Sequence, residues 1–387
     1  MMHRWLLVGV TLLLTGTIAF GADYGILGGE GLTTAGDLTV NWKALERNNK
    51  LNTNYRGDDP FSPARIRVFM VKQFDSTKKV NVEFLWDSEA DPHIFGAYLT
   101  LQRVFGPVGI RTGFIPSSLG NYSTRSTYFN QNPVVGVPAI WHYKTPLNST
   151  GSFNNDSIFS RPHGVNFGYG IPIAYDACWN FGSEFFIDKY GWWDASLAVT
   201  TGSTSNPLST SNLGYQKIAR IGFRTSPAFR FGVSFANSSW IRPDAKIKYP
   251  KNPREYYQNV GNVFWEASSR HWQWFGEAMH CAWQTPFFKE GTLTATGGYL
   301  ESRWNFYPGY YWGLRLDRMQ FNEISESVSG VSKQEAWGYN FNRIETAIAW
   351  RVIREGVVRL DYQGTYFDEG EEYHPIHFLA LQWMFAF

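Results

Sequence analysis

Charged residues recur at every second position in several short segments of this chain. Arg65 and Arg67 form one such pair, and Arg343 and Glu345 form another. In an extended strand successive side chains point to opposite faces, so the members of each pair share one face. Rows of fixed guanidinium and carboxylate groups can select ions in a water-filled space. The sequence therefore predicts strands with one charged, solvated face.

The same alternation places many more charged residues on this face. Its basic members are Arg65, Arg67, Arg111, Arg220, Arg224, Arg230, Arg315, Arg343, Arg351 and Arg359. Its acidic members are Glu83, Asp87, Glu184, Asp188, Asp194, Asp317, Glu345 and Asp361. The balance is slightly basic and suggests a mild preference for anions. We expect most of these arginines to pair with carboxylates across strands, which would keep the face wet without selecting ions.

The opposite faces of the same segments are apolar. Over 79–87, four apolar residues share one face, namely Val80, Val82, Phe84 and Trp86. A soluble sandwich would turn such faces towards a core, whereas a membrane barrel would turn them towards lipid. Many segments are near the 9–11 residues that a tilted membrane strand needs, which favours the barrel. In a later segment, Leu293, Ala295 and Tyr299 are predicted to face lipid in the same way.

Such segments predict an all-β chain, a transmembrane antiparallel β-barrel of about 16 strands, an even number that allows closure. They lie near 36–45, 64–73, 79–87, 93–103, 107–115, 175–188, 191–202, 215–224, 228–240, 258–268, 272–284, 291–303, 308–318, 338–351, 356–367 and 374–387. Connections alternate between short and long, as expected when short turns face the periplasm and long loops face outward. The longest connection, about 116–174, follows the fifth strand, and loops of this length are usually functional.

The composition and the start of the chain suit an exported membrane protein. Residues 1–21 combine Arg4, an apolar run and a small-residue ending, which predicts a signal peptide preceding a barrel over 22–387. A membrane helix is the alternative for this stretch, but its apolar run is short for a span. The aromatic share of 18% suits girdles at both membrane interfaces. The net charge of +2 gives no reason to expect a nucleic-acid partner.

Together these features resemble the bacterial outer-membrane porin superfamily. The alternation that ends in Phe385 and Phe387 resembles the closing strand and membrane-assembly signal of such proteins. The stretch 113–116, followed by Asn132 and Pro133, is similar to the phosphate-selective and related substrate-specific porins, without a motif that resolves the subfamily. The resemblance implies a long loop folded into the lumen, a homotrimer, and a location in the bacterial outer membrane.

A loop folded inward would bring its own charges next to those of the strands. The candidate pore-lining and constriction residues are Arg65, Arg67, Glu83, Arg111, Arg125, Lys144, Arg161, Arg220, Arg230 and Arg315. Arg111, Arg125 and Arg161 belong to the fifth strand and its loop, so they are the residues most expected to set an anion preference. The expected function is passive diffusion of small polar or anionic solutes, with no cofactor.

Other functions have less support in the sequence. There is no Gly-x-Ser-x-Gly, His-Glu-x-x-His or phosphate-binding glycine loop, so no enzyme is predicted. His374 and His377 would face opposite ways on a strand, so no metal site is predicted. The acidic run 368–372 could hold divalent cations that bridge to lipopolysaccharide, or form a solvated loop. A barrel that encloses a multihaem cytochrome is the alternative function, because the partner would then carry the haems.

Overall fold

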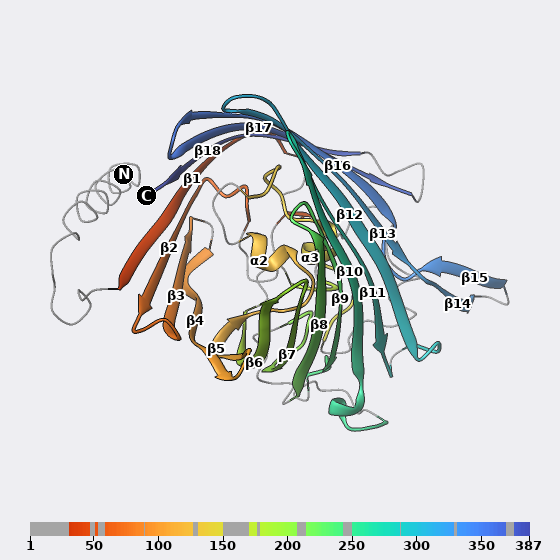
Figure 1. Cartoon of the computed structure of the whole chain (residues 1–387). Helices are drawn as coiled ribbons and strands as arrows, with labels where there is room; N and C mark the ends of the chain where they lie inside the picture. Colours follow the sequence, from red (N-terminus) through yellow and green to blue (C-terminus); the bar gives the residue numbers. More distant parts are fainter. Residues whose placement is uncertain are drawn as a thin grey trace.

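A closed antiparallel barrel of 16 strands forms the body of the protein in the computed structural model (Figure 1). The structure describes residues 31–46, 51–52, 59–88, 90–126, 131–149, 170–175, 179–206, 214–242, 250–286, 288–328, 331–368 and 375–387. Every barrel strand pairs with the strands before and after it around the wall, and the last strand returns to the first. The prediction of an all-β barrel of about 16 strands is therefore confirmed.

All of the predicted segments correspond to barrel strands. These are β1 (Leu32–Glu46), β2 (Ala64–Gln73), β3 (Lys78–Asp87), β4 (Ala90–Phe105), β5 (Val108–Pro116), β6 (Trp179–Tyr190), β7 (Trp193–Thr201), β8 (Tyr215–Ser226), β9 (Phe229–Ser239), β10 (Tyr257–Ser269), β11 (Trp272–Gln284), β12 (Thr292–Tyr307), β13 (Tyr310–Phe321), β16 (Phe341–Ile353), β17 (Gly356–Phe367) and β18 (Ile376–Ala386). Among the described residues, short helical elements lie between strands: α2 (Tyr122–Ser126), α3 (Ala139–His142) and the 3-10 turn η2 (Pro253–Glu255).

A two-stranded hairpin, β14 (Glu323–Val328) with β15 (Val331–Ala336), is the β-structure that the sequence did not predict. It lies in the connection 319–337, which we expected to be a plain loop. Its strands are short, and neither face of either strand is continuously apolar, so the alternation that marks the barrel strands is missing. In Figure 1 the hairpin projects away from the barrel wall.

The barrel closes where β1 meets β18. Their register begins at Asp37 opposite Ala386 and runs antiparallel from there. The backbone of Gly36 exchanges two hydrogen bonds with the backbone of Phe387, at 2.8 and 2.9 Å. A Cβ atom at Gly36 would lie 2.5 Å from the Phe387 ring, so only a residue without a side chain leaves enough space for that ring. The C-terminal residue is thus part of the closing seam, while its role as an assembly signal stays a prediction.

Burial alternates along the strands as a membrane barrel requires. On β9, Phe231, Val233 and Phe235 are exposed on the outside, whereas Ser234 between them is buried on the inside. On β12 the direction is opposite to our prediction, because the apolar residues Leu293, Ala295 and Tyr299 are buried inside. Thr292, Thr294 and Thr296, in the first half of β12, point outward instead. The cause is a loop that packs against β12 from within, as described below.

The two ends of the barrel differ in the length of their connections. At the end that holds Phe387, which we call the turn end, every connection between barrel strands has two to four residues, such as Phe74 to Thr77 between β2 and β3. The opposite end, with the longer connections, is the loop end. No helix among the described residues is long and apolar enough to cross a membrane. The segment 1–21, predicted to be a signal peptide, lies outside the described residues.

Candidate functional site

The candidate site is the lumen together with the connection between β5 and β6, whose described parts are 117–126, 131–149 and 170–175. We call these parts the inner loop. Its helices α2 and α3 lie inside the ring of strands (Figure 1), so the predicted inward fold of this loop is confirmed. Buried loops are uncommon because their backbone groups need partners that water cannot supply. The barrel wall supplies those partners through carboxylates and arginines.

Glu277, on β11, binds the start of the inner loop. Its carboxylate accepts the backbone N–H groups of Asn121 (2.9 Å) and Tyr122 (2.6 Å). It also accepts the indole N–H of Trp141 at 3.1 Å and the side-chain amide of Asn262 at 3.1 Å. The group is buried, so these four donors replace its hydration. This carboxylate therefore holds α2 and α3 to one side of the lumen.

A second set of wall residues binds the stretch 134–139. The backbone N–H groups of Val135, Gly136 and Ala139 donate to wall carboxylates at 2.6–3.1 Å. These carboxylates belong to Asp361, Glu345 and Asp317, respectively. Two wall arginines donate back to loop carbonyls: Arg315 to Gly136 at 2.8 Å and Arg359 to Val134 at 3.1 Å. The wall thus binds both the N–H groups and the carbonyl groups of the loop backbone, which fixes the position of the loop against β13, β16 and β17.

Apolar packing completes the attachment. Trp141, Ile140 and Leu119 are fully buried. The Tyr143 ring lies 4.7 Å from the ring of Phe341 on β16. On the wall, a Cβ atom at Gly313 would lie 2.3 Å from the carbonyl oxygen of Pro133, so glycine is needed for this close approach. Most buried apolar residues of the inner loop form one core with inward apolar residues of the wall, while Val135 packs in a second cluster with Phe61 and Phe378.

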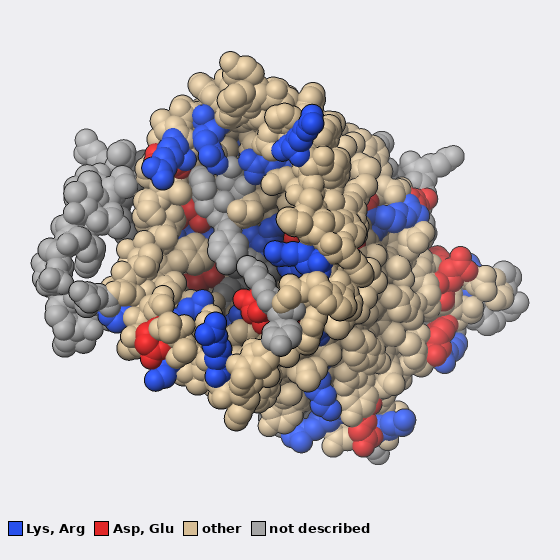
Figure 2. All heavy atoms as spheres, viewed as in Figure 1, with Lys and Arg blue, Asp and Glu red and all other residues tan. Residues whose placement is uncertain are grey.

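On the wall formed by β2 to β9, the arginines of the ion pairs are partly exposed to the lumen. Arg111 is bonded to Glu184 at 2.6 Å; the arginine side chain is 26% exposed and the carboxylate 4%. Arg65 lies 3.5 Å from Asp87, with exposures of 22% and 0%. Two further groups share the pattern of pairing: Arg67 with Asp37 and Glu83, and Arg220 and Arg230 with Asp194. In the pairs on β1 to β6 the guanidinium groups cover the carboxylates and face the lumen. Figure 2 shows Lys and Arg side chains around the hollow of the barrel.

No family model and no curated protein matches the sequence. Among solved structures, OmpF of Salmonella typhi in complex with daunomycin is similar at a TM-score of 0.56 and 11% identity, over 92% of this chain and 97% of that one. The chain has the porin fold. The outer membrane channel DcaP of Acinetobacter baumannii is similar at a TM-score of 0.54 and 10% identity, over 95% and 100% of the two chains.

A third structure of this fold is an anion-selective porin from Comamonas acidovorans. Its TM-score is 0.53 at 9% identity, over 92% of this chain and 99% of that one. The sequence-based resemblance to outer-membrane porins therefore agrees with the structural neighbours, and the subfamily stays unresolved.

Within this porin fold, the predicted pore-lining residues divide into two groups. Those on the partly exposed wall are Arg65, Arg67, Glu83, Arg111, Arg220 and Arg230. Arg125 and Arg315 are buried instead. Arg125 pairs with Glu301 at 2.5 Å, and Arg315 pairs with Asp317 and Glu345. These two residues hold the inner loop to the wall, as does Arg220, whose Nε also donates to the carbonyl of Gly120 at 3.2 Å. The expected cross-strand pairing of most arginines is thus observed.

Two predicted residues of the loop have other positions. Lys144 is half-buried in the inner loop, where its backbone forms a bridge with Pro172. Arg161 lies outside the described residues, as does most of the acidic run 368–372. Asp368, at the start of that run, pairs with Arg318 at 2.7 Å on the outer surface. The assignment of these residues to a constriction stays a prediction.

Sequence reasoning missed the carboxylates that matter most for the loop, Glu277 and Glu301. Glu277 has only apolar or small neighbours in the sequence, so no charged alternation marks it, whereas Glu301 shares a face with Arg303, a face of its strand that we expected to meet lipid. A usable signal was present, since each is a single acidic residue at an inward position of a strand. A buried acidic group needs donors, and the nearest unassigned donors were those of the long loop.

His142 and Cys281 are two further reactive side chains inside the barrel, and both are buried and hydrogen-bonded to other protein groups. Burial lowers the pKa of His142, in α3, to about 3, so the imidazole is neutral and bonds to the carbonyl of Leu51. Cys281 is a buried free thiol. Among the described residues no group of three or more His, Cys, Asp or Glu side chains could hold a metal ion.

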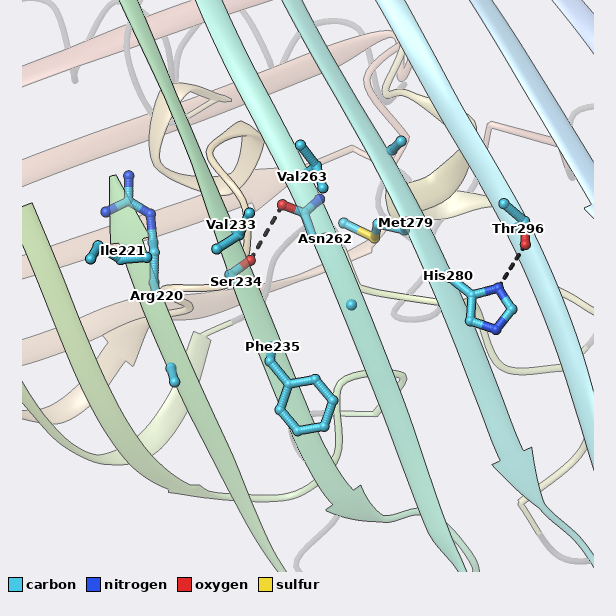
Figure 3. A pocket seen from close by; sticks show the side chains of 13 residues that line it. Arg220, Ile221, Val233, Ser234, Phe235, Asn262, Val263, Met279, His280 and Thr296 are labelled. Carbon is cyan, nitrogen blue, oxygen red and sulfur yellow. Dashed lines mark hydrogen bonds between the residues drawn. The ribbon is translucent and has the colours of Figure 1, made fainter. Parts of the chain in front are cut away.

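A groove of about 630 Å³ lies on the outer surface, over β8 to β12 (Figure 3). It is open above Gly261, where no heavy atom would contact an added Cβ. His280 and Thr296 border it and are hydrogen-bonded to each other at 2.8 Å across β11 and β12. The exposed residues that line the groove point outward, so it faces the surroundings of the barrel and is separate from the lumen.

Proposed function

We propose that this protein is an outer-membrane channel for passive diffusion of small polar solutes, with a mild preference for anions. One observation carries the proposal: on β1 to β6, partly exposed guanidinium groups cover buried carboxylates. An ion in the lumen then meets the positive member of each pair first. Fixed charges at the surface of a pore determine which ion enters.

The fold and the outer surface support this proposal. The exposed side chains of the wall are largely apolar, and aromatic residues such as Trp304, Tyr307 and Trp350 gather near the turn end. Such a surface fits a lipid environment with an aromatic girdle. In this arrangement the turn end faces the periplasm and the predicted signal peptide exports the chain. The structural neighbours include proteins described as an outer membrane channel and an anion-selective porin.

The proposal is tested by single-channel recording of the purified, refolded protein in a planar bilayer. Discrete, stable current steps are expected, and a salt gradient should give a reversal potential of the sign for anion preference. The partly exposed arginines are the physical reason. Protein that inserts but never conducts would contradict the channel, and a reversal potential of the opposite sign would contradict the anion preference alone.

The alternative of a sheath for a multihaem cytochrome has less support. A wide, unobstructed lumen would be needed for such a partner. The inner loop instead occupies one side of the lumen, with Trp141 and Ile140 packed against the wall. Diffusion of small solutes needs only the space beside the loop.

We also propose that the channel is a homotrimer in contact with lipopolysaccharide. One structural neighbour is described as a trimer form of OmpT, an outer membrane protein of Vibrio cholerae, with a TM-score of 0.51. Native mass spectrometry from a mild detergent should give the mass of three chains, and conductance should rise in groups of three steps. A single-chain mass across all mild detergents would overturn this part of the proposal without affecting the channel.

A further inference from the structure

A second cavity, of about 330 Å³, lies at the turn end of the barrel. Three parts of the wall form it: the turn between β10 and β11, the hairpin turn between β12 and β13, and the end of β16. Ten of the described residues line it, and none of these ten is acidic. Two arginines, Arg303 and Arg351, belong to this lining together with His271.

The guanidinium group of Arg303 is held in a fixed direction. Its central carbon lies 3.9 Å from the centre of the Tyr311 ring, an arrangement in which cation and ring attract each other. Its Nε donates to Asn305 Oδ1 at 3.3 Å. Asn305 is in turn fixed by the carbonyl of His271, which accepts its backbone N–H at 2.8 Å. A guanidinium held in this way loses little freedom when it binds a ligand.

Arg351 contributes a second guanidinium group from the end of β16. Its backbone N–H donates to the carbonyl of Gly309 at 2.7 Å, which ties the strand to the β12–β13 turn, while its side chain is exposed. Arg359 adds a third positive charge nearby, because its central carbon lies 5.8 Å from the centre of the same Tyr311 ring. Arg303 and Arg359 thus lie near one ring and Arg351 lines the same cavity, so the potential in the cavity is positive.

From this geometry we infer an oxyanion-binding site in the cavity, for a phosphate or carboxylate group held between Arg303 and Arg351. Guanidinium groups bind both kinds of oxyanion through paired N–H bonds. The rings of Tyr310 and Phe306, which also line the cavity, offer apolar surface to the rest of a small organic anion. The inference goes beyond the proposed channel, since the site is separate from the arginines of β2 to β9 and can fill whether or not current flows.

A phosphate group for this cavity could come from two sources. One is a dissolved anion in the vestibule at the turn end, and the other is the head group of an anionic phospholipid at the rim. Phe306 and Tyr307 are exposed aromatic residues beside the cavity, so its edge is accessible from the membrane interface as well. The experiment below therefore has one arm for each source.

In the first arm, inorganic phosphate is titrated into the full-length protein in a phosphate-free, uncharged detergent, and binding is followed by ³¹P NMR line width and by calorimetry. In the second arm, native mass spectrometry measures anionic phospholipid that remains bound after purification. The variants are Arg303→Gln, Arg351→Gln and both together. Arg351→Gln changes an exposed side chain and is expected to fold normally. The matched control is Arg354→Gln, a turn-end arginine that is 93% exposed and does not line the cavity.

We expect phosphate to bind the unmodified protein and the control equally. Each single variant should bind it roughly tenfold more weakly, because one charge-assisted contact is lost. If phosphate does not bind but phospholipid is retained and is lost only in the cavity variants, the site is a head-group site. Absence of both ligands, or equal binding by all variants, would overturn the inference. None of these measurements depends on conduction, so the result is independent of the proposed channel.

Discussion

Replacement of Glu277 by alanine is expected to release the first half of the inner loop and to raise single-channel conductance. The carboxylate accepts hydrogen bonds from the backbone of Asn121 and Tyr122 and from the indole of Trp141. A buried donor left without its acceptor costs about 1–3 kcal/mol, so three such donors destabilise the docked loop strongly. An undocked loop leaves a wider and more variable path, and current noise should rise together with conductance.

The conservative change Glu277→Gln keeps one acceptor oxygen and should give an intermediate conductance. Glu323→Ala is the control, because Glu323 is an exposed carboxylate on the β14–β15 hairpin, far along the chain from the inner loop. Heat-dependent mobility on a gel establishes that each barrel is folded. A folded Glu277→Ala protein with the conductance and noise of the unmodified protein would show that this carboxylate does not control the loop.

Neutralising Arg65, Arg67 and Arg111 together as glutamines is expected to shift the reversal potential towards cations. Their partners on β1, β3 and β6 are buried carboxylates, which would then face the lumen uncompensated. A unit charge about 4 Å from a passing ion is worth about 1 kcal/mol even in water, or roughly fivefold in relative permeability per charge. The change should weaken as salt concentration rises, because ions screen the fixed charges.

A charge-neutral change separates selectivity from simple loss of side-chain volume. Arg111→Gln combined with Glu184→Gln removes one bonded pair but leaves the net charge of the lumen unchanged. This double variant should shift the reversal potential much less than the triple arginine variant, because no buried carboxylate is left uncompensated. If the triple arginine variant behaves in the same way as this control, the exposed guanidinium groups do not set ion preference.

Much of the barrel could be predicted from the sequence because lipid and water impose a strict period of two. Phe231, Val233 and Phe235 show this directly, since each outward residue is apolar and its inward neighbours are small or charged. The ion-paired arginines of β2 to β9 were found by the same rule. The terminal position of Phe387 next to β1 follows from closure of the barrel.

The part that could not be predicted is the part governed by the inner loop. Loop docking reversed the expected facing of Leu293, Ala295 and Tyr299, because a third kind of surroundings, the packed loop, competes with lipid for apolar side chains. It also turned Arg315 from a lumen residue into a buried partner of Glu345. Alternation reports which residues share a face but does not report what that face meets.

The attachment of the inner loop also has a consequence for the order of folding. Its backbone bonds to the wall join residues that are 156, 209 and 226 positions apart in the chain, from Asn121 to Glu277, Gly136 to Glu345 and Val135 to Asp361. Contacts between such distant residues form late, because the entropy of closing a long segment must be overcome first. The loop is synthesised early, yet its partners exist only once β11, β16 and β17 are in place. Barrel assembly should therefore precede docking of the loop, and a slow final phase should follow strand formation during refolding.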